Sequence, residues 1–122
     1  MAPVQRYEDL VAWQKAYALV LPIYATTSNF PSDERYGLTS QMRRCAIGIP
    51  SNIAEGFARR TTRDYLRFLD IALGSTYELQ TQLRLSLDLH YHQDNETMDL
   101  VAEVERVLNG LIRSLELKIK NS

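Results

Sequence analysis

Apolar residues recur every three or four positions along four stretches of the chain, and this spacing predicts helices rather than strands. We expect helices over residues 8–28, 33–60, 62–89 and 96–119. The connections between them are short, and short connections place consecutive helices antiparallel. The sequence therefore predicts an all-α, antiparallel up-down-up-down four-helix bundle that fills residues 1–122 as a single domain.

Each predicted helix carries a row of apolar or small residues that is expected to face the core. In chain order, the rows are Trp13, Tyr17, Val20 and Tyr24, widened by Leu10, Ala16 and Leu21; Leu38, Met42, Cys45, Ile49 and Ile53; Tyr65, Leu69, Ala72, Thr76, Leu79, Leu83 and Ser86; and Val101, Val104, Leu108, Leu111 and Leu115. The last two rows repeat every 3.5 residues, which is typical of helices packed at a shallow angle.

Further apolar residues lie away from these rows, and they favour a second face that another subunit covers. These residues are Leu66, Leu73, Tyr77, Leu85 and Leu89. We therefore expect the protein to self-associate.

Local signals place the helix ends and one interruption. Ser32 is a suitable N-cap for the second helix, and Thr61 with Asp64 resembles a capping box for the third. Pro22 lies inside the first helix and predicts a bend there. Pro50 allows either one kinked helix or two short helices. We favour the kinked helix because the apolar row stays in phase across the proline.

The composition is that of an ordinary globular protein, with 45% apolar residues, 24% charged residues and a net charge of −1. The single cysteine, Cys45, excludes an intramolecular disulfide and fits a reducing compartment. The N-terminal residues lack the apolar segment of a signal peptide, and no stretch reaches the roughly 18 apolar residues of a membrane span. We therefore expect a cytoplasmic protein that does not enter membranes.

Candidate catalytic groups are few. His90 and His92 share a turn with Asp94, but neither a cysteine nor a third histidine completes a metal site. Cys45 belongs to an apolar row, where a buried and unreactive thiol is expected. We predict no catalytic residue, no metal and no cofactor.

Three polar residues near the helix centres allow two interpretations. Asn52 and Glu55 lie one helical turn apart just after Pro50, and Glu78 lies midway along the third helix. They could form a buried polar network that fixes helix register. They could also form a catalytic carboxylate pair. The structural interpretation is favoured because no histidine, nucleophile or metal-ligand set lies beside them.

Arginines provide the main functional signal. Six of them lie between residues 43 and 67, where only two residues are acidic, so the charge is polarised along the sequence. They are Arg43, Arg44, Arg59, Arg60, Arg63 and Arg67. The spacing of Arg59, Arg63 and Arg67 predicts one helical face that contacts phosphates, with Tyr65 near enough to stack on a base. The alternative is a solvated face or ion pairs to the acidic fourth helix.

Several motifs together resemble one family. They include Tyr7-Glu8-Asp9-Leu10-Val11-Ala12-Trp13-Gln14-Lys15, Tyr36-Gly37-Leu38, Gln41-Met42-Arg43-Arg44, Ile49-Pro50-Ser51-Asn52-Ile53-Ala54-Glu55-Gly56 and Glu78-Leu79-Gln80-Thr81-Gln82-Leu83. The chain resembles the four-helix-bundle family named after the protein encoded in intervening sequences of 23S ribosomal RNA genes. The accessory variability protein of diversity-generating retroelements belongs to the same group.

The resemblance implies a ring-like homopentamer without enzymatic activity, and the retroelement branch implies binding to nucleic acid and a reverse transcriptase. The motif residues carried over are Pro50, Asn52, Glu55, Gly56 and Glu78, and we interpret them as structural. The first hypothesis is therefore a non-enzymatic oligomeric module that binds RNA or a ribonucleoprotein through its arginines. The alternative is an oligomeric scaffold for a protein partner.

Overall fold

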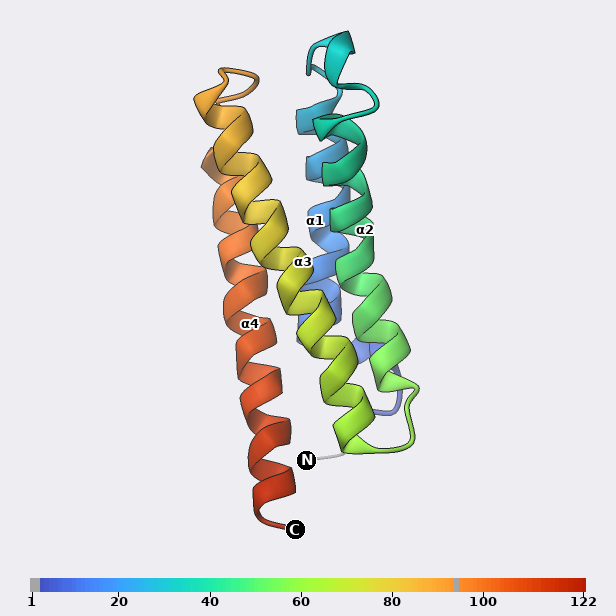
Figure 1. Cartoon of the computed structure of the whole chain (residues 1–122). Helices are drawn as coiled ribbons and strands as arrows, with labels where there is room; N and C mark the ends of the chain where they lie inside the picture. Colours follow the sequence, from blue (N-terminus) through green and yellow to red (C-terminus); the bar gives the residue numbers. More distant parts are fainter. Residues whose placement is uncertain (1–2, 94) are drawn as a thin grey trace.

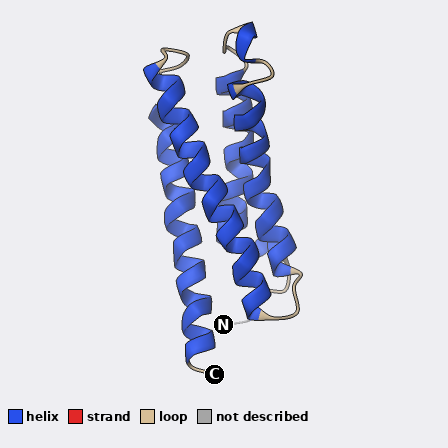
Figure 2. Cartoon of the chain, in the orientation of Figure 1, coloured by secondary structure: helices blue, strands red, loops and turns tan. Residues whose placement is uncertain are grey.

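The chain forms the predicted up-down four-helix bundle (Figure 1). The computed structural model describes residues 3–93 and 95–122. Its helices are α1 (Val11–Thr27), α2 (Leu38–Phe57), α3 (Thr62–Asp88) and α4 (Asn95–Lys120), with short 3-10 turns η1 (Tyr7–Asp9) and η2 (Ser32–Glu34). Each long helix contacts the next along the chain, and α1 also contacts α4, which closes the bundle. Figure 2 shows helices joined by loops over the described residues.

The second helix is shorter than predicted at both ends. Ser32 opens the separate turn η2 instead of capping α2, which begins at Leu38. The Glu34 carboxylate accepts a hydrogen bond from the backbone N–H of Leu38 at 3.2 Å, so it satisfies a free donor at the start of the helix. At the other end α2 stops at Phe57, and a loop separates it from α3.

The third helix begins as its sequence predicts. The Thr61 hydroxyl accepts a hydrogen bond from the backbone N–H of Asp64 at 3.1 Å. Such an N-cap stabilises a helix by about 1 kcal/mol. The cap fixes where the chain turns from the α2–α3 loop into α3, and so it positions the arginines on both sides of that junction.

The predicted core rows of α2, α3 and α4 are confirmed. Met42, Ile49, Leu69 and Leu79 have no solvent exposure, and Val101 and Leu108 of α4 are equally buried. Leu38, Tyr65, Leu111 and Leu115 are partly buried at the ends of their rows and pack against this core.

The predicted core row of α1 is wrong for its aromatic residues and right for Ala16. The buried residues of this helix are Ala12, Ala16, Leu19, Ile23, Thr26 and Thr27. Trp13 and Val20 are half-buried, while Tyr17 and Tyr24 are exposed. Two alanines in the buried row let α1 approach its neighbours closely, whereas an aromatic row there would push the helices apart. The aromatic side chains therefore lie at the outer edge of α1.

Pro50 lies inside one continuous α2, as the phase of its apolar row predicted. The missing N–H of Pro50 leaves the carbonyl of Ala46 without its usual helical donor. The Ser51 hydroxyl donates to the carbonyl of Ile47 at 2.8 Å, and the Asn52 amide donates to that of Gly48 at 2.8 Å. These side chains bond the next two carbonyls along the helix.

The second apolar face predicted on α3 is only partly exposed. Leu66 and Leu73 pack against the core, while Tyr77, Leu85 and Leu89 remain exposed. In the described part of the chain, no helix combines the length and apolarity needed to cross a membrane.

Candidate binding surfaces

The six arginines predicted to bind nucleic acid lie in two groups near opposite ends of α2. Arg43 and Arg44 lie in its second turn, whereas Arg59 and Arg60 follow its last residue and Arg63 and Arg67 belong to α3. The helical rise of 1.5 Å per residue separates the groups by about 20 Å along α2. The predicted single face is therefore wrong, because α2 ends before Arg59 and no one helix carries Arg59, Arg63 and Arg67.

The loop arginines, Arg59, Arg60, Arg63 and Arg67, are all exposed around the α2–α3 loop. Arg59 donates from Nε to the carbonyl of Glu55 at 3.1 Å, and its guanidinium lies 5.0 Å from the ring centroid of Phe68. Arg67 pairs with Asp64 at 3.5 Å. Arg60 and Arg63 form no ion pair with any residue that the structure describes. This group therefore presents uncompensated positive charge.

Two acidic residues of α4, Glu103 and Glu105, contact residues other than the loop arginines. Glu103 pairs with Lys15 at 2.9 Å and with Arg106 at 3.8 Å, and the Lys15 contact lowers the pKa of Glu103. Glu105 accepts a hydrogen bond from the Gln80 amide at 2.8 Å. Within the described residues, no ion pair joins the loop arginines to α4. The carboxylates of α4 therefore do not neutralise the charge of these arginines through ion pairs.

The second arginine group lies beside tyrosine rings. Arg43 donates from Nε to the Thr27 hydroxyl at 2.8 Å and from Nη2 to the Tyr24 carbonyl at 3.4 Å. Its guanidinium lies 4.5 Å from the Tyr24 ring centroid. Arg43 thus ties α2 to the end of α1, and Arg44 is left exposed beside it.

A hollow of about 500 Å³ opens at this end of α2. Its lining includes Tyr24, Arg35, Tyr36, Ser40, Arg43 and Arg44, and no acidic residue. Sequence reasoning missed Arg35 and Tyr36. Both residues precede α2, in the turn between η2 and Leu38, so helical spacing from Arg43 gave no signal for them.

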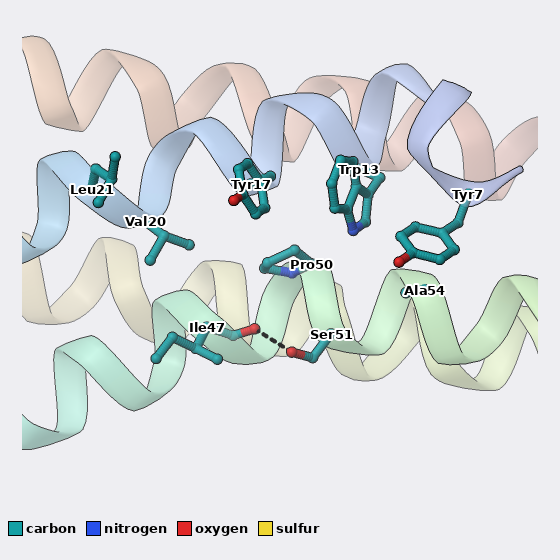
Figure 3. Close-up of a pocket in the computed structure, with 9 residues that line it drawn as sticks. All are labelled: Tyr7, Trp13, Tyr17, Val20, Leu21, Ile47, Pro50, Ser51 and Ala54. Carbon is teal, nitrogen blue, oxygen red and sulfur yellow. Dashed lines mark hydrogen bonds between the residues drawn. The ribbon is translucent and has the colours of Figure 1, made fainter.

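An apolar groove of about 390 Å³ runs between α1 and α2 (Figure 3). Its residues include Tyr7, Trp13, Tyr17 and Leu21 on one side and Ile47 and Pro50 on the other. The Trp13 ring stacks on Tyr17 at 4.8 Å between centroids and meets Tyr7 edge-on at 5.2 Å. The aromatic rings of Tyr7, Trp13 and Tyr17 therefore form one continuous wall of the groove.

Large apolar side chains of this groove are highly exposed to solvent. Tyr17 is 61% exposed and Leu21 is 77% exposed. No charged residue belongs to its lining. Contiguous exposed apolar surface of this kind is typical of interaction sites in proteins.

The motif residues of α2 have distinct local roles. Pro50 and Gly56 are buried, and Asn52 is half-buried. A Cβ atom on Gly56 would lie 2.8 Å from the Phe68 Cβ and 3.0 Å from the Tyr65 Cδ1. Glycine at this position therefore permits the close crossing of α2 and α3.

The expected buried network of Asn52, Glu55 and Glu78 is wrong, because both carboxylates are exposed. Glu55 lies two residues from the buried Ile53, which turns it about 200° away from the core row of α2. Asn52 uses its side-chain amide within its own helix.

Cys45 is buried, as predicted. Burial, reinforced by Glu78, raises the pKa of its thiol to about 12. The thiol is therefore protonated at neutral pH and lacks the thiolate character that a nucleophile or metal ligand needs.

The two histidines belong to the end of α3. His90 adopts a left-handed backbone with φ of 64°, and the N–H of Tyr91 bonds the carbonyl of Ser86 at 2.9 Å. This is the geometry of a Schellman helix end. His92 lies 3.0 Å from the Ser86 hydroxyl through Nε2. Asp94 lies outside the described residues, and among residues 3–93 and 95–122 no three His, Cys, Asp or Glu side chains are arranged to hold a metal.

Comparisons with known proteins agree with this architecture. Residues 8–113 match the family model described as 23S rRNA-intervening sequence protein. A crystal structure from Bacteroides thetaiotaomicron, of a protein with unknown function from the S23 ribosomal protein family, superposes with a TM-score of 0.77 at 20% identity. The match covers 87% of this chain and 98% of that chain. No curated protein matches the sequence. Since the family model spans most of its length, the chain belongs to the 23S rRNA-intervening sequence protein family.

Proposed function

We propose that this protein is a non-enzymatic cytoplasmic binding module that contacts RNA through the loop arginines. The observation that carries the proposal is the exposure of Arg59, Arg60, Arg63 and Arg67 around one loop, where Asp64 is the acidic partner of Arg67. Guanidinium groups bind phosphates in bidentate fashion and neutralise their charge.

The net charge of −1 does not oppose this function. Binding to a phosphate backbone depends on the local field at the contact surface, which falls off within about 10 Å at moderate salt. Two acidic residues of α4, Glu103 and Glu105, are engaged with Lys15, Arg106 and Gln80. The family name refers to 23S ribosomal RNA, which makes structured RNA the first ligand to test.

The experiment measures affinity for a structured RNA duplex across a salt series. Log affinity should fall linearly with log salt, with a slope of roughly 0.7 to 0.9 per phosphate neutralised. The Arg60→Ala/Arg63→Ala variant removes two loop arginines that form no ion pair with the described residues, so its slope should be shallower by about 1.4 to 1.8.

An Arg84→Ala/Arg106→Ala variant is the matched control. It removes the same charge from exposed positions of α3 and α4, where the arginines pair with Asp88 and Glu103. Its salt slope should equal that of the unmodified protein. Equal slopes for all three proteins would refute a contact at the loop, and no binding at low salt would refute RNA binding altogether.

A second candidate function is an oligomeric scaffold, and the apolar groove favours it. We propose that a second copy of the chain covers the groove, with exposed residues of α3 such as Tyr77 and Leu85 as its counterpart. The homopentamer expected from the family resemblance is one such assembly. Association would remove Tyr17 and Leu21 from water and gain about 25 cal/mol for each Å² of apolar surface buried.

Sedimentation velocity tests this association directly. The unmodified protein should sediment as an oligomer, and Leu21→Glu should sediment as a monomer because it places a charge in the groove. Leu117→Glu changes an exposed leucine of α4 outside the groove and should leave the oligomer intact. A monomeric unmodified protein would leave the groove to a different protein partner and refute self-association.

A further inference from the structure

The hollow at the start of α2 has a chemistry that neither the apolar groove nor the loop arginines share. Its volume of about 500 Å³ falls within the roughly 300 to 1,000 Å³ typical of small-ligand sites. Arg35, Arg43 and Arg44 line it without an acidic residue among them. Its local field therefore favours an anion.

The same hollow offers flat aromatic surface. The Arg35 guanidinium lies 5.4 Å from the Tyr36 ring centroid. Tyr36 is 86% exposed, so most of its ring surface remains available to a ligand. An anion site beside an open ring selects a ligand that carries both a negative group and a planar group.

The arginines are positioned to hold the negative group. Arg43 spends two of its N–H donors on Thr27 and Tyr24, and a guanidinium has five, so it is fixed in place with donors to spare. Arg44 is exposed and forms no ion pair in the described part of the chain. Thr39 and Ser40 add hydroxyl donors to the lining, and phosphate oxygens accept from both kinds of group.

We propose that this hollow binds one unpaired nucleotide, with its base on Tyr36 and its phosphate on Arg35 and Arg44. The inference rests on the proposed RNA function and adds a second contact, specific for single strands. A nucleotide within a strand and a free mononucleotide offer the same chemistry. Base stacking on tyrosine tolerates every base, so the site selects unpaired nucleotides rather than a sequence.

The test uses a fluorescent, unstructured oligouridylate and the full-length protein. Tyr36→Ala and Arg44→Ala should each weaken its binding about tenfold, the loss expected for one stacked base or one phosphate contact. Binding of an RNA duplex through the loop arginines should be unchanged. Arg84→Ala, at an exposed position of α3, is the matched control and should bind both RNAs normally. Circular dichroism verifies that each variant is folded.

Uridine monophosphate and inorganic phosphate, added as competitors, identify the ligand. Competition by the mononucleotide that is lost in Tyr36→Ala would assign the site to free nucleotides as well as RNA. Competition by phosphate at equal strength would refute the role of the ring. If the loop variant weakens duplex binding but Tyr36→Ala and Arg44→Ala bind the single strand normally, this inference fails and the proposed function stands. If no RNA binds while the mononucleotide binds through Tyr36, the proposed function fails and the site stands.

Discussion

The side chains of Trp13 and Tyr17 stack with an interplanar angle of 23°, at the solvent edge of α1 rather than in its buried row. Trp13 is the sole tryptophan of the chain, so its fluorescence reports on the groove that the two rings line.

Dilution should shift the Trp13 emission to longer wavelength if a second copy covers the groove, because dissociation returns the indole to water. Tyr17→Glu should show the long-wavelength emission at every concentration, since it charges the groove wall. Leu117→Glu, outside the groove, should follow the unmodified protein. An emission spectrum independent of concentration in an oligomeric protein would place the interface elsewhere.

Gly56→Ala should destabilise the bundle by roughly 1 to 3 kcal/mol, the usual cost of overpacking. The new Cβ would meet the Phe68 Cβ at 2.8 Å and the Tyr65 carbonyl at 3.2 Å. Urea unfolding followed by circular dichroism measures the change. Gly110→Ala is the control, because its Cβ meets no atom within 4 Å. It should stabilise α4 by up to about 1 kcal/mol through helix propensity alone, and destabilisation of both variants alike would contradict the packing argument.

His90→Gly should raise the free energy of unfolding by about 1 kcal/mol. His90 holds a φ of 64° at the end of α3, where a side chain is strained and glycine is not. The same substitution at Asp88, inside the last turn of α3, should instead cost about 0.3 kcal/mol. Thermal unfolding of the two variants under one condition shows whether each substitution raises or lowers the free energy of unfolding. A destabilised His90→Gly would mean that contacts of the imidazole stabilise the protein by more than the backbone strain destabilises it.

Tyr65→Phe should stabilise the protein at neutral pH by about 1 kcal/mol. The Tyr65 hydroxyl is buried and has no hydrogen-bond partner among the described residues, so its removal relieves a desolvation cost. Tyr91→Phe is the matched control, because the Tyr91 hydroxyl donates to the Glu34 carboxylate at 2.9 Å. It should destabilise the protein, and denaturant unfolding distinguishes the two signs.

The same tyrosine gives an alkaline pH dependence. Burial raises the pKa of Tyr65 from 10.0 to about 12, so the folded state keeps its proton more tightly than the unfolded state. The protonated Tyr65 therefore makes its full contribution to the free energy of unfolding below pH 10, and this contribution is lost as pH rises toward 12. Tyr65→Phe should therefore lose less stability than the unmodified protein over this interval. Identical alkaline profiles would show that the hydroxyl is hydrated in solution.

The sequence was sufficient for the fold because α2, α3 and α4 each carry one dominant apolar row. In α1 two rows compete. Trp13 and Tyr17 are the larger side chains, but Ala12 and Ala16 are the ones buried against the neighbouring helices. Helices that pack closely need small side chains at the contact, so hydrophobicity alone does not decide which row is buried. The sequence of α1 alone does not determine which row faces the core, because that depends on the distance to the neighbouring helices.

The sequence identified the arginines, but it did not predict how they are arranged in space. Its single face required a helix that continues through Arg59, and the capped start of α3 at Thr61 shows that the chain reorients there. Arg35 and Tyr36 went unnoticed because their neighbours in the hollow come partly from α1 through Tyr24, a contact that only the tertiary fold creates.

The separation of the arginine groups by the length of α2 would make the protein sensitive to ligand length. At the rise of about 3.4 Å per nucleotide of one strand in double-helical DNA, the roughly 20 Å between the two ends of α2 corresponds to about six nucleotides, so an RNA strand must be several nucleotides long to reach both ends. Shorter oligonucleotides could engage only one end at a time. Longer ones would gain the second contact at high effective concentration, so affinity would rise in a step at a defined site size rather than smoothly with length.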